Sequence, residues 1–365
     1  MSRKRKIIKW ALIAFVSFIV FTAGFGYWFI SLLPAKDPAA ANVKEITIND
    51  LPYLTEDVPK YRGKILAVVT SCSEMGESKK PTGYELTELS RAYYVFVANG
   101  FEVDVASPAG GKPSVIIDGD DVGEFDFAFL NDSEAQSKVN NTIAMKDVVP
   151  DDYVAVYFVG GKGTMFDFPQ NQHIQSLVRE YYEEGKVIGA VCHGPAAFVN
   201  VTLRDGSQLL DGKQVSSFTN KEELLLIKDA RSIFPFLLQD KLIENGAIFN
   251  EGHMYLEKIS EDGNLITGQN PWSTWAVAEA VVNRLGYKPK ARIITGEENS
   301  IVVLNILEDH GYDKAKESMT ELRAVKQLQL NRELIAMHSI VAVMQWNITK
   351  AIKIIGLLKH AKSLA

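Results

Sequence analysis

Cysteine is scarce in this sequence: Cys72 and Cys192 are the only two among 365 residues. Two cysteines cannot build a disulfide scaffold or a cysteine-ligated zinc site. Basic charge is not in excess, since 39 Lys and Arg stand against 45 Asp and Glu and give a net charge of −6. This balance argues against a nucleic-acid partner, which needs a basic surface. With 26 Gly, 13 Pro and 47% hydrophobic residues, collagen-like repeats and intrinsic disorder are excluded.

The longest uncharged run covers residues 10–33, and five basic residues precede it. It is long enough to cross a bilayer core, which needs about 20 residues, and longer than the apolar part of a signal peptide, about 7–15 residues. We therefore predict that residues 1–35 are a basic cytoplasmic segment and a single-pass transmembrane helix of the inner cell membrane. The main domain would then lie outside the cytoplasm, in the periplasm of a bacterium. The small residues at positions 39–41 leave cleavage after this helix open.

Short apolar runs then alternate with amphipathic segments. Residues 36–60 are polar and contain Pro38, Pro52 and Pro59, which predicts a linker. Beyond it, the pattern predicts strands over residues 64–70, 101–106, 154–159 and 187–191, and helices over residues 84–99 and 170–184. This order predicts a flavodoxin-like α/β fold, with a mostly parallel sheet and helices on both faces.

Cys192 has the sequence context of a reactive thiol. It stands between the predicted strand 187–191 and Gly194-Pro195, a glycine that permits a close turn and a proline suited to the first helical position. A residue on such a strand-to-helix turn projects out of the sheet. We expect the positive end of the following helix to lower the pKa of the thiol. The pattern favours a cysteine nucleophile elbow over a buried structural thiol.

Seven segments resemble, in order and spacing, the ThiJ/PfpI superfamily. They are KILAVVTS, TGYELTEL, GFEVDVASPAGG, VGGKGTMFDFP, GKVIGAVCHGPAAF, GKQVSSFTNKEE and NLITGQNPWSTWAVAEAV. The nearest branch is the heat-shock-type one, which includes glutathione-independent glyoxalases, deglycases and holding chaperones. The resemblance implies the class I glutamine amidotransferase-like fold and a ThiJ/PfpI-like domain over residues 61–287.

The resemblance also implies the site residues by position. The family nucleophile falls on Cys192, the adjacent histidine on His193 and the acidic partner on Glu223, with Glu222 as a rival one residue away. The glutamate that contacts the nucleophile falls on Glu88. The four together would supply a thiolate that adds to a carbonyl and groups that move its proton.

The substrate-binding positions implied by the resemblance are Gly161, Lys162 and His193. Backbone amides of Gly161 and His193 would bind an oxyanion. Lys162 stands where glyoxalase-type members have the histidine of Gly-His-Gly, so a cation is kept and a metal-binding imidazole is lost. No metal and no cofactor are expected.

Further departures concern Arg91-Ala92, which replaces the usual His-Pro, and Trp272 and Trp275, which follow an Asn-Pro pair. The tryptophans are expected to pack the domain, or else to narrow the pocket. Cys72 follows the first predicted strand and is expected either as a small apolar filler or as a partner of Cys192 in a reversible disulfide.

Residues 288–365 lie outside the resemblance and are expected to form a helical extension. The segment 334–358 is apolar but interrupted by polar and basic residues, which makes it a poor spanning segment. It is expected to pack against the domain or a second subunit of a homodimer, or to lie on a membrane surface.

The resemblance implies a membrane-anchored cysteine enzyme that acts on small reactive carbonyls in stress protection. The reaction would be of the glyoxalase III or deglycase type, with methylglyoxal converted to lactate. Two other interpretations stay open. One is a holding chaperone or thiol redox sensor without turnover, and the other is a cysteine peptidase or amidase.

Overall fold

The structure is a computed structural model that describes residues 3–35, 38–119 and 121–364. The chain forms two compact units, Met1–Pro38 with Ile294–Ala365, and Ala39–Ile293. The larger unit is therefore inserted in sequence between the two parts of the smaller one. The sequence had placed the domain boundaries at residues 61 and 287.

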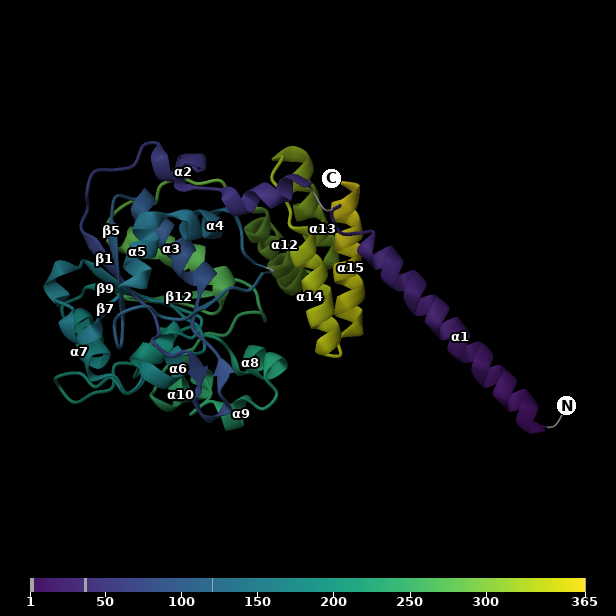
Figure 1. Cartoon of the computed structure of the whole chain (residues 1–365), viewed down its shortest axis with the longest axis horizontal. Helices are drawn as coiled ribbons and strands as arrows, with labels where there is room; N and C mark the ends of the chain where they lie inside the picture. The colour runs from purple at the N-terminus through teal and green to yellow at the C-terminus, as the bar shows by residue number, and fades with distance from the viewer. Residues whose placement is uncertain (1–2, 36–37, 120, 365) are drawn as a thin grey trace. The chain divides into compact units, whose positions relative to one another are not determined.

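The larger unit is built on a seven-stranded sheet of order β12-β13-β9-β8-β1-β5-β7 (Figure 1). Its strands are β1 (Lys64–Val68), β5 (Glu102–Ser107), β7 (Ile143–Ala144), β8 (Ala155–Phe158), β9 (Val187–Val191), β12 (Ile259–Asp262) and β13 (Leu265–Gly268). All neighbouring strands are parallel except the edge pair β12 and β13. The predicted mostly parallel α/β sheet is confirmed.

Helices cover both faces of this sheet, and Figure 1 shows α3, α4 and α5 above the strands and α6, α7 and α10 below them. The α-helices are α2 (Pro52–Thr55), α3 (Leu86–Ala98), α4 (Glu124–Asn131), α5 (Ser133–Asn140), α6 (Thr164–Asp167), α7 (Gln172–Glu183), α8 (Asn220–Leu226), α9 (Ala230–Ile233), α10 (Leu238–Glu244) and α11 (Thr274–Arg284). The 3-10 helices are η1 (Pro38–Glu45), η2 (Ile48–Asp50), η3 (Gly76–Ser78), η4 (Met145–Asp147), η5 (Pro150–Asp152), η6 (Gly194–Phe198) and η7 (Pro271–Ser273).

Strand β9 shows how the two faces are filled. All five of its residues are buried, and successive side chains point to opposite faces. Ile188 and Ala190 join the apolar cluster that includes Leu177 and Val178 of α7. A Cβ at Gly189 would lie 2.9 Å from a methyl group of Val281 in α11. A glycine is therefore required where α11 crosses the strand.

Three small two-stranded sheets complete the unit. They pair β2 (Glu74–Met75) with β3 (Lys80–Pro81), β4 (Tyr84–Glu85) with β6 (Val115–Ile116), and β10 (Gln214–Val215) with β11 (Ile248–Phe249). The pairing of β4 explains why α3 begins at Leu86 and not at residue 84 as predicted. The observed β9 has the predicted bounds, while the other predicted elements differ by one or two residues at their ends.

The predicted linker contributes to the core of the larger unit. Leu51, Tyr53 and Leu54 are buried, and the Tyr53 ring meets Phe125 edge-on with 6.0 Å between ring centroids. The Lys290 ammonium donates a hydrogen bond of 2.7 Å to the Tyr53 carbonyl. The buried apolar side chains between the prolines therefore hold residues 51–54 in the core of the larger unit, although the composition of residues 36–60 predicted a linker.

The smaller unit contains the helical extension that the sequence predicted. Its helices are α12 (Gly296–His310), α13 (Tyr312–Thr320), the π-helix η8 (Glu321–Val325), α14 (Arg332–Met344) and α15 (Ile348–Ser363). The apolar segment 334–358 is thus two helices, because the Asn347 side chain caps α15 by accepting from the Lys350 amide at 3.0 Å. Leu334, Ile354 and Leu357 are buried, so this segment packs within its own chain.

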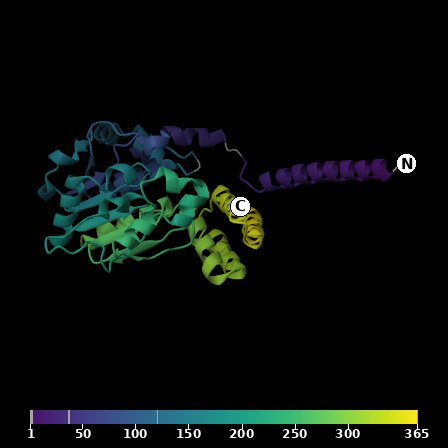
Figure 2. The same cartoon turned by 90° about the horizontal axis from the view of Figure 1, so that it is seen from below.

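Helix α1 (Arg3–Ile30) is one continuous helix (Figure 2). Over Trp10–Ile30 its mean hydropathy is 1.9 and none of this window is buried. By length and composition, this helix could cross a membrane.

A prediction tests the close packing at β9. Gly189→Ala should lower the free energy of unfolding by about 1–3 kcal/mol, because the added methyl group overpacks the contact with Val281. Gly119→Ala is the matched control, since a Cβ there meets nothing within 4 Å, and its effect should stay within about 0.5 kcal/mol. Urea-induced unfolding followed by tryptophan fluorescence measures both. Equal stability of the two variants would contradict the packing described for Gly189.

Candidate active site

The backbone at Cys192 turns sharply at the carboxyl end of β9. Its φ is +58°, a left-handed conformation that non-glycine residues rarely adopt and that is concentrated at functional sites. Two hydrogen bonds of 2.9 Å hold it: the Cys192 N–H donates to the Gly268 carbonyl, and the Phe218 N–H donates to the Cys192 carbonyl. A Cβ at Gly194 would lie 2.2 Å from the Phe158 carbonyl oxygen, so the turn presses against the end of β8. The predicted nucleophile elbow has this geometry.

The expected lowering of the thiol pKa is not found. Only the short 3-10 helix η6 (Gly194–Phe198) follows Cys192, in place of the α-helix that the sequence suggested. Complete burial raises the pKa of Cys192 well above its usual value, and the charges of Glu88 and Glu85 act in the same direction. The charge of Lys162 opposes this rise. Burial therefore favours the neutral thiol of Cys192, and a neighbouring base would have to take its proton before the sulfur could act as a nucleophile.

His193 and Glu223 form a relay beside the thiol. The Cys192 Sγ lies 3.3 Å from the His193 Nδ1, and the His193 Nε2 lies 2.6 Å from the Glu223 Oε2. Both side chains are buried, and Glu223 is placed by the first turn of α8. A neutral imidazole can take the thiol proton at Nδ1, while the Glu223 carboxylate stabilises the imidazolium that results.

Glu222 has a different task from its neighbour. It closes a capping box with Thr219 at the start of α8, and its carboxylate accepts five hydrogen bonds of 2.7–3.0 Å. Two come from Thr219 and one each from the Tyr255 N–H, the Gln269 amide and the Asn270 amide. The structure thus brings Glu223 to the histidine and leaves Glu222 to hold the surrounding loops.

Glu88 lies in the first turn of α3 and is fully buried. Its Oε2 accepts a hydrogen bond of 2.7 Å from the Gly160 N–H. No N–H or O–H donor of the described residues reaches its Oε1, and the carboxyl group interacts with the Cys192 thiol. Burial raises the pKa of Glu88 well above its usual value, and the charge of Glu85 adds to the rise. Glu88 is therefore a carboxylic acid that can donate a proton beside the sulfur.

Two backbone amides face this group without a protein acceptor. In the part of the chain that the structure describes, the N–H groups of Gly161 and His193 donate to no protein atom. Gly161 has φ of +107° and packs so closely that a Cβ would lie 2.3 Å from the Gly83 carbonyl. A Cβ at Gly160 would lie 2.8 Å from the His193 nitrogen. The double glycine therefore keeps room for an oxyanion beside the elbow.

Lys162 and Glu85 lie at the same edge of the sheet. Lys162 follows the double glycine and is half-buried. Glu85 is the residue just before α3, makes no capping hydrogen bond with its side chain, and is 9% exposed. Burial raises the pKa of Glu85 to about 8, with the charges of Asp118 and Asp121 adding to the rise and that of Lys162 opposing it. Sequence reasoning missed Glu85, whose only signal is its position three residues before Glu88.

Arg91 and Trp275, where the sequence departs from the family pattern, contribute to the packing of the larger unit. The Arg91 guanidinium forms a buried ion pair with Asp126 at 3.2 Å, and Asp126 also accepts a hydrogen bond from the Ser90 hydroxyl. The Trp275 ring meets Phe125 edge-on at 5.0 Å between centroids and lies under the Arg292 guanidinium at 4.2 Å. Both Trp272 and Trp275 are buried.

Cys72 is half-buried and, like Cys192, a free thiol. Its N–H donates to the Thr70 hydroxyl at 3.0 Å, and that hydroxyl donates to Asp167 at 2.9 Å. Burial, with the nearby charge of Asp167, raises the pKa of Cys72 to about 11. A reversible disulfide between the two cysteines stays a prediction.

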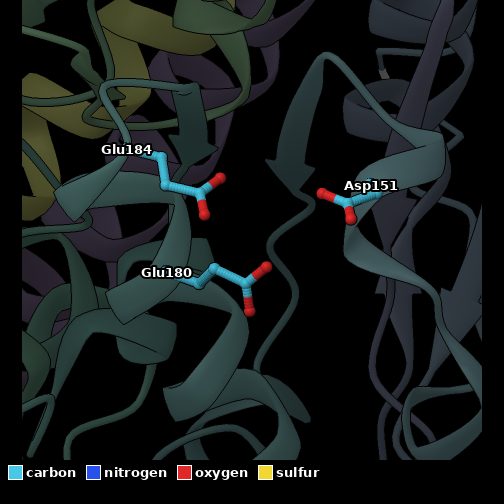
Figure 3. A group of neighbouring side chains, drawn as sticks. All are labelled: Asp151, Glu180 and Glu184. Carbon is cyan, nitrogen blue, oxygen red and sulfur yellow. The ribbon is translucent and has the colours of Figure 1, made fainter.

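Three carboxylates gather away from these residues. Oxygen atoms of Asp151, Glu180 and Glu184 lie within 4.8 Å of one another, and Figure 3 shows Asp151 facing the two glutamates from a separate segment. The Lys186 ammonium pairs with Asp151 at 3.4 Å and with Glu184 at 3.2 Å. This lysine already supplies their counter-charge.

At the carboxyl edge of the parallel sheet, a buried thiol stands on a strained turn beside a histidine–glutamate relay. These features define an α/β protein whose site is built around a cysteine. Residues 80–284, more than half of the chain, match the DJ-1/PfpI family. The chain belongs to this family, and the ThiJ/PfpI resemblance seen in the sequence is confirmed.

Relatives and solved structures agree with this assignment. The chain is 32% identical over 236 residues to Glyoxalase 3 of Candida albicans, covering 60% of this chain and 97% of the relative. It is 31% identical over 245 residues to the glutathione-independent glyoxalase HSP31 of Saccharomyces cerevisiae, covering 61% and 98%. It is also similar to the Francisella tularensis Rapid Encystment Protein 24 KDa (TM-score 0.58, 35% identity, 61% and 99% covered) and to the crystal structure of the Candida albicans glyoxalase III (0.57, 30%, 62% and 98%).

The two adjacent glutamates of α8 give a direct test of the assigned roles. Glu222→Gln should destabilise the fold by about 2 kcal/mol or more, because an amide cannot accept from all five donors. Glu223→Gln should keep nearly full stability but slow the alkylation of Cys192 roughly tenfold, since the imidazolium loses its counter-charge. Urea unfolding and iodoacetamide labelling of the Cys192 peptide measure the two effects. Slow labelling with Glu222→Gln and destabilisation with Glu223→Gln would reverse the assignment.

Proposed function

We propose that this chain is a glyoxalase-type enzyme that needs no glutathione and converts small 2-oxoaldehydes such as methylglyoxal into 2-hydroxy acids such as lactate. The observation that carries the proposal is the Cys192 thiol, 3.3 Å from His193 Nδ1 and in contact with the protonated Glu88. The names of the relatives, which are glutathione-independent glyoxalases, support the same reaction.

The first step is the addition of sulfur to the aldehyde carbon, C1. His193 takes the thiol proton, and the sulfur forms a bond with C1 while the carbonyl π electrons move onto oxygen. The N–H groups of Gly161 and His193 are free to stabilise this oxyanion. Glu88 then gives its proton to the oxygen, which yields a neutral hemithioacetal and a Glu88 carboxylate.

The second step moves hydrogen between the two carbons. The Glu88 carboxylate removes the proton on C1, and an enediol forms as the C2 carbonyl oxygen is protonated from His193. Glu88 then returns this proton to C2 while the proton of the C1 hydroxyl passes back to the Glu88 carboxylate, which gives a neutral thioester on Cys192. Water then hydrolyses the thioester to the 2-hydroxy acid and the free thiol. C1 is oxidised while C2 is reduced, so the balance needs only water.

Cysteine variants test this activity. Cys192→Ala should reduce lactate formation from methylglyoxal by at least about 10³-fold, since no nucleophile remains. Cys72→Ala is the matched control and should retain activity within about twofold, because Cys72 takes no part in the relay. An enzymatic lactate assay measures both. Lactate formation by the Cys192→Ala variant would contradict the mechanism.

We propose further that α1 anchors the chain in a membrane with its basic end in the cytoplasm. The support is an apolar helix, Trp10–Ile30, of which no part of the hydropathy window is buried in the described chain, preceded by basic residues. Anchoring would place the α/β unit outside the cytoplasm.

Membrane extraction tests the anchor. After carbonate treatment of membranes from producing cells, the full chain should remain in the pellet, because a spanning helix is not released by high pH. A variant lacking residues 10–30 should move to the supernatant. Release of the full chain would contradict the anchor.

A further inference from the structure

Lys162 is held next to Glu85 by backbone contacts at the carboxyl edge of the sheet. The Glu85 N–H donates to the Gly160 carbonyl at 3.4 Å. A Cβ at Gly161 would lie 3.1 Å from the Glu85 nitrogen. These contacts fix the backbone of Glu85 relative to the double glycine, and Lys162 is the residue that follows it.

The Lys162 ammonium has no direct partner in the ranges 3–35, 38–119 and 121–364. It makes no hydrogen bond and no ion pair within 4.0 Å there, although it is half-buried. Other partly buried lysines of the same unit do find carboxylates: Lys138 pairs with Glu134 at 3.5 Å, Lys186 with Glu184 at 3.2 Å and Lys213 with Asp262 at 3.5 Å. Partial burial of an ammonium group whose N–H donors make no hydrogen bond costs free energy. An anionic ligand that accepts from these donors would offset this cost.

Lys162 directly follows Gly161, whose N–H is one of the two amides beside the elbow, and the charges of Glu85, Glu223 and Cys192 act on its ammonium. Burial disfavours its ammonium form, but Glu85, Glu223 and Cys192 outweigh burial and raise its pKa. Lys162 therefore stays protonated and cannot act as an amine nucleophile. What it offers beside Cys192 is a fixed positive charge with three N–H donors.

We propose that Lys162 binds an anionic group of the substrate, so that the site selects small oxo compounds that carry a carboxylate or a phosphate near the aldehyde. This inference rests on the proposed addition of Cys192 to an aldehyde. The reaction balance is unchanged: a 2-oxoaldehyde with an anionic substituent takes up one water and becomes a 2-hydroxy acid with the same substituent. Lys162 acts here as a specificity-determining residue.

The ionisation of Glu85 should make the preference for anions depend on pH. Below about pH 8 its carboxyl group is mainly neutral and leaves Lys162 free for a ligand anion, whereas above that pH its carboxylate competes for the ammonium. The other titratable groups that act on Glu85 are Asp118 and Asp121 from the segment before α4, and Glu88 from the first turn of α3. The preference for anions should therefore fall as the pH rises through about 8.

Two alkylating reagents test the proposal on the full chain in non-ionic detergent. Iodoacetate and iodoacetamide react with a thiolate in the same way, but only iodoacetate carries a charge, so the ratio of their rates is independent of the thiolate fraction. Labelling of the Cys192 peptide is followed by mass spectrometry. At pH 7 the iodoacetate-to-iodoacetamide ratio should exceed that of free cysteine, and Lys162→Met should lower it roughly tenfold, the effect of one nearby charge partly screened by water.

Matched variants sharpen the test. Lys162→Arg should retain the high ratio. Glu85→Gln should keep the ratio high at pH 9, where that of the wild-type chain has fallen. Protection of Cys192 from iodoacetamide by acetate or by inorganic phosphate, at constant ionic strength, tells which anion the site prefers.

Three results would overturn the proposal: a wild-type ratio equal to that of free cysteine, a ratio unchanged by Lys162→Met, or no labelling by either reagent. The last would mean that the site does not admit even a two-carbon anion. None of these measurements needs turnover. A chain that prefers iodoacetate but forms no lactate would contradict the proposed reaction and leave the anion site standing, and the reverse result would do the opposite.

Discussion

The backward turn of the chain at Cys192 is the constraint on which the site depends. An L-residue at φ of +58° is strained, and the turn persists because its amide bonds to Gly268 at the end of β13 and its carbonyl to Phe218 in the loop before α8. The segment at Phe218 leads directly into α8, which carries Glu223. Fixing one strained peptide thus fixes the relative positions of thiol, imidazole and carboxyl groups, and the close contact at Gly194 leaves no space in which the turn could relax.

The interior of the site holds protons on its acidic groups more firmly than water would. Burial keeps both Cys192 and Glu88 in their neutral forms, whereas in water the carboxyl group would be ionised at neutral pH. A neutral acid next to a neutral thiol avoids two buried negative charges in one small space. The charges that remain near the sulfur are the Glu223 carboxylate, which belongs to the histidine relay, and the Lys162 ammonium, which does not take part in proton transfer.

The order of strands and helices was accessible from the sequence because the predicted strands are short apolar or alternating runs and both predicted helices end next to a glycine, Gly100 and Gly185. The sharp turn at Cys192 could be predicted because Gly194-Pro195 follows directly after it. Other features depend on contacts between distant segments. Glu222 and Glu223 are adjacent carboxylates in sequence, and only the fold shows which one reaches His193. The thiol pKa was predicted in the wrong direction, because complete burial outweighs a 3-10 helix of five residues. No pattern in the sequence indicates that Glu85 and Lys162 lie near one another.

The division of the smaller unit between the two ends of the chain has a consequence for biosynthesis. The carbonyl groups of Ser31 and Leu32 accept hydrogen bonds from Lys362 and Arg332, which the ribosome adds some three hundred residues later. At a typical rate of about 5–20 residues per second, the segment after α1 waits for tens of seconds, with the whole α/β unit emerging in between. The α/β unit can close as soon as Ile293 has left the ribosome, whereas the helical unit is completed only after Lys362 has also left it.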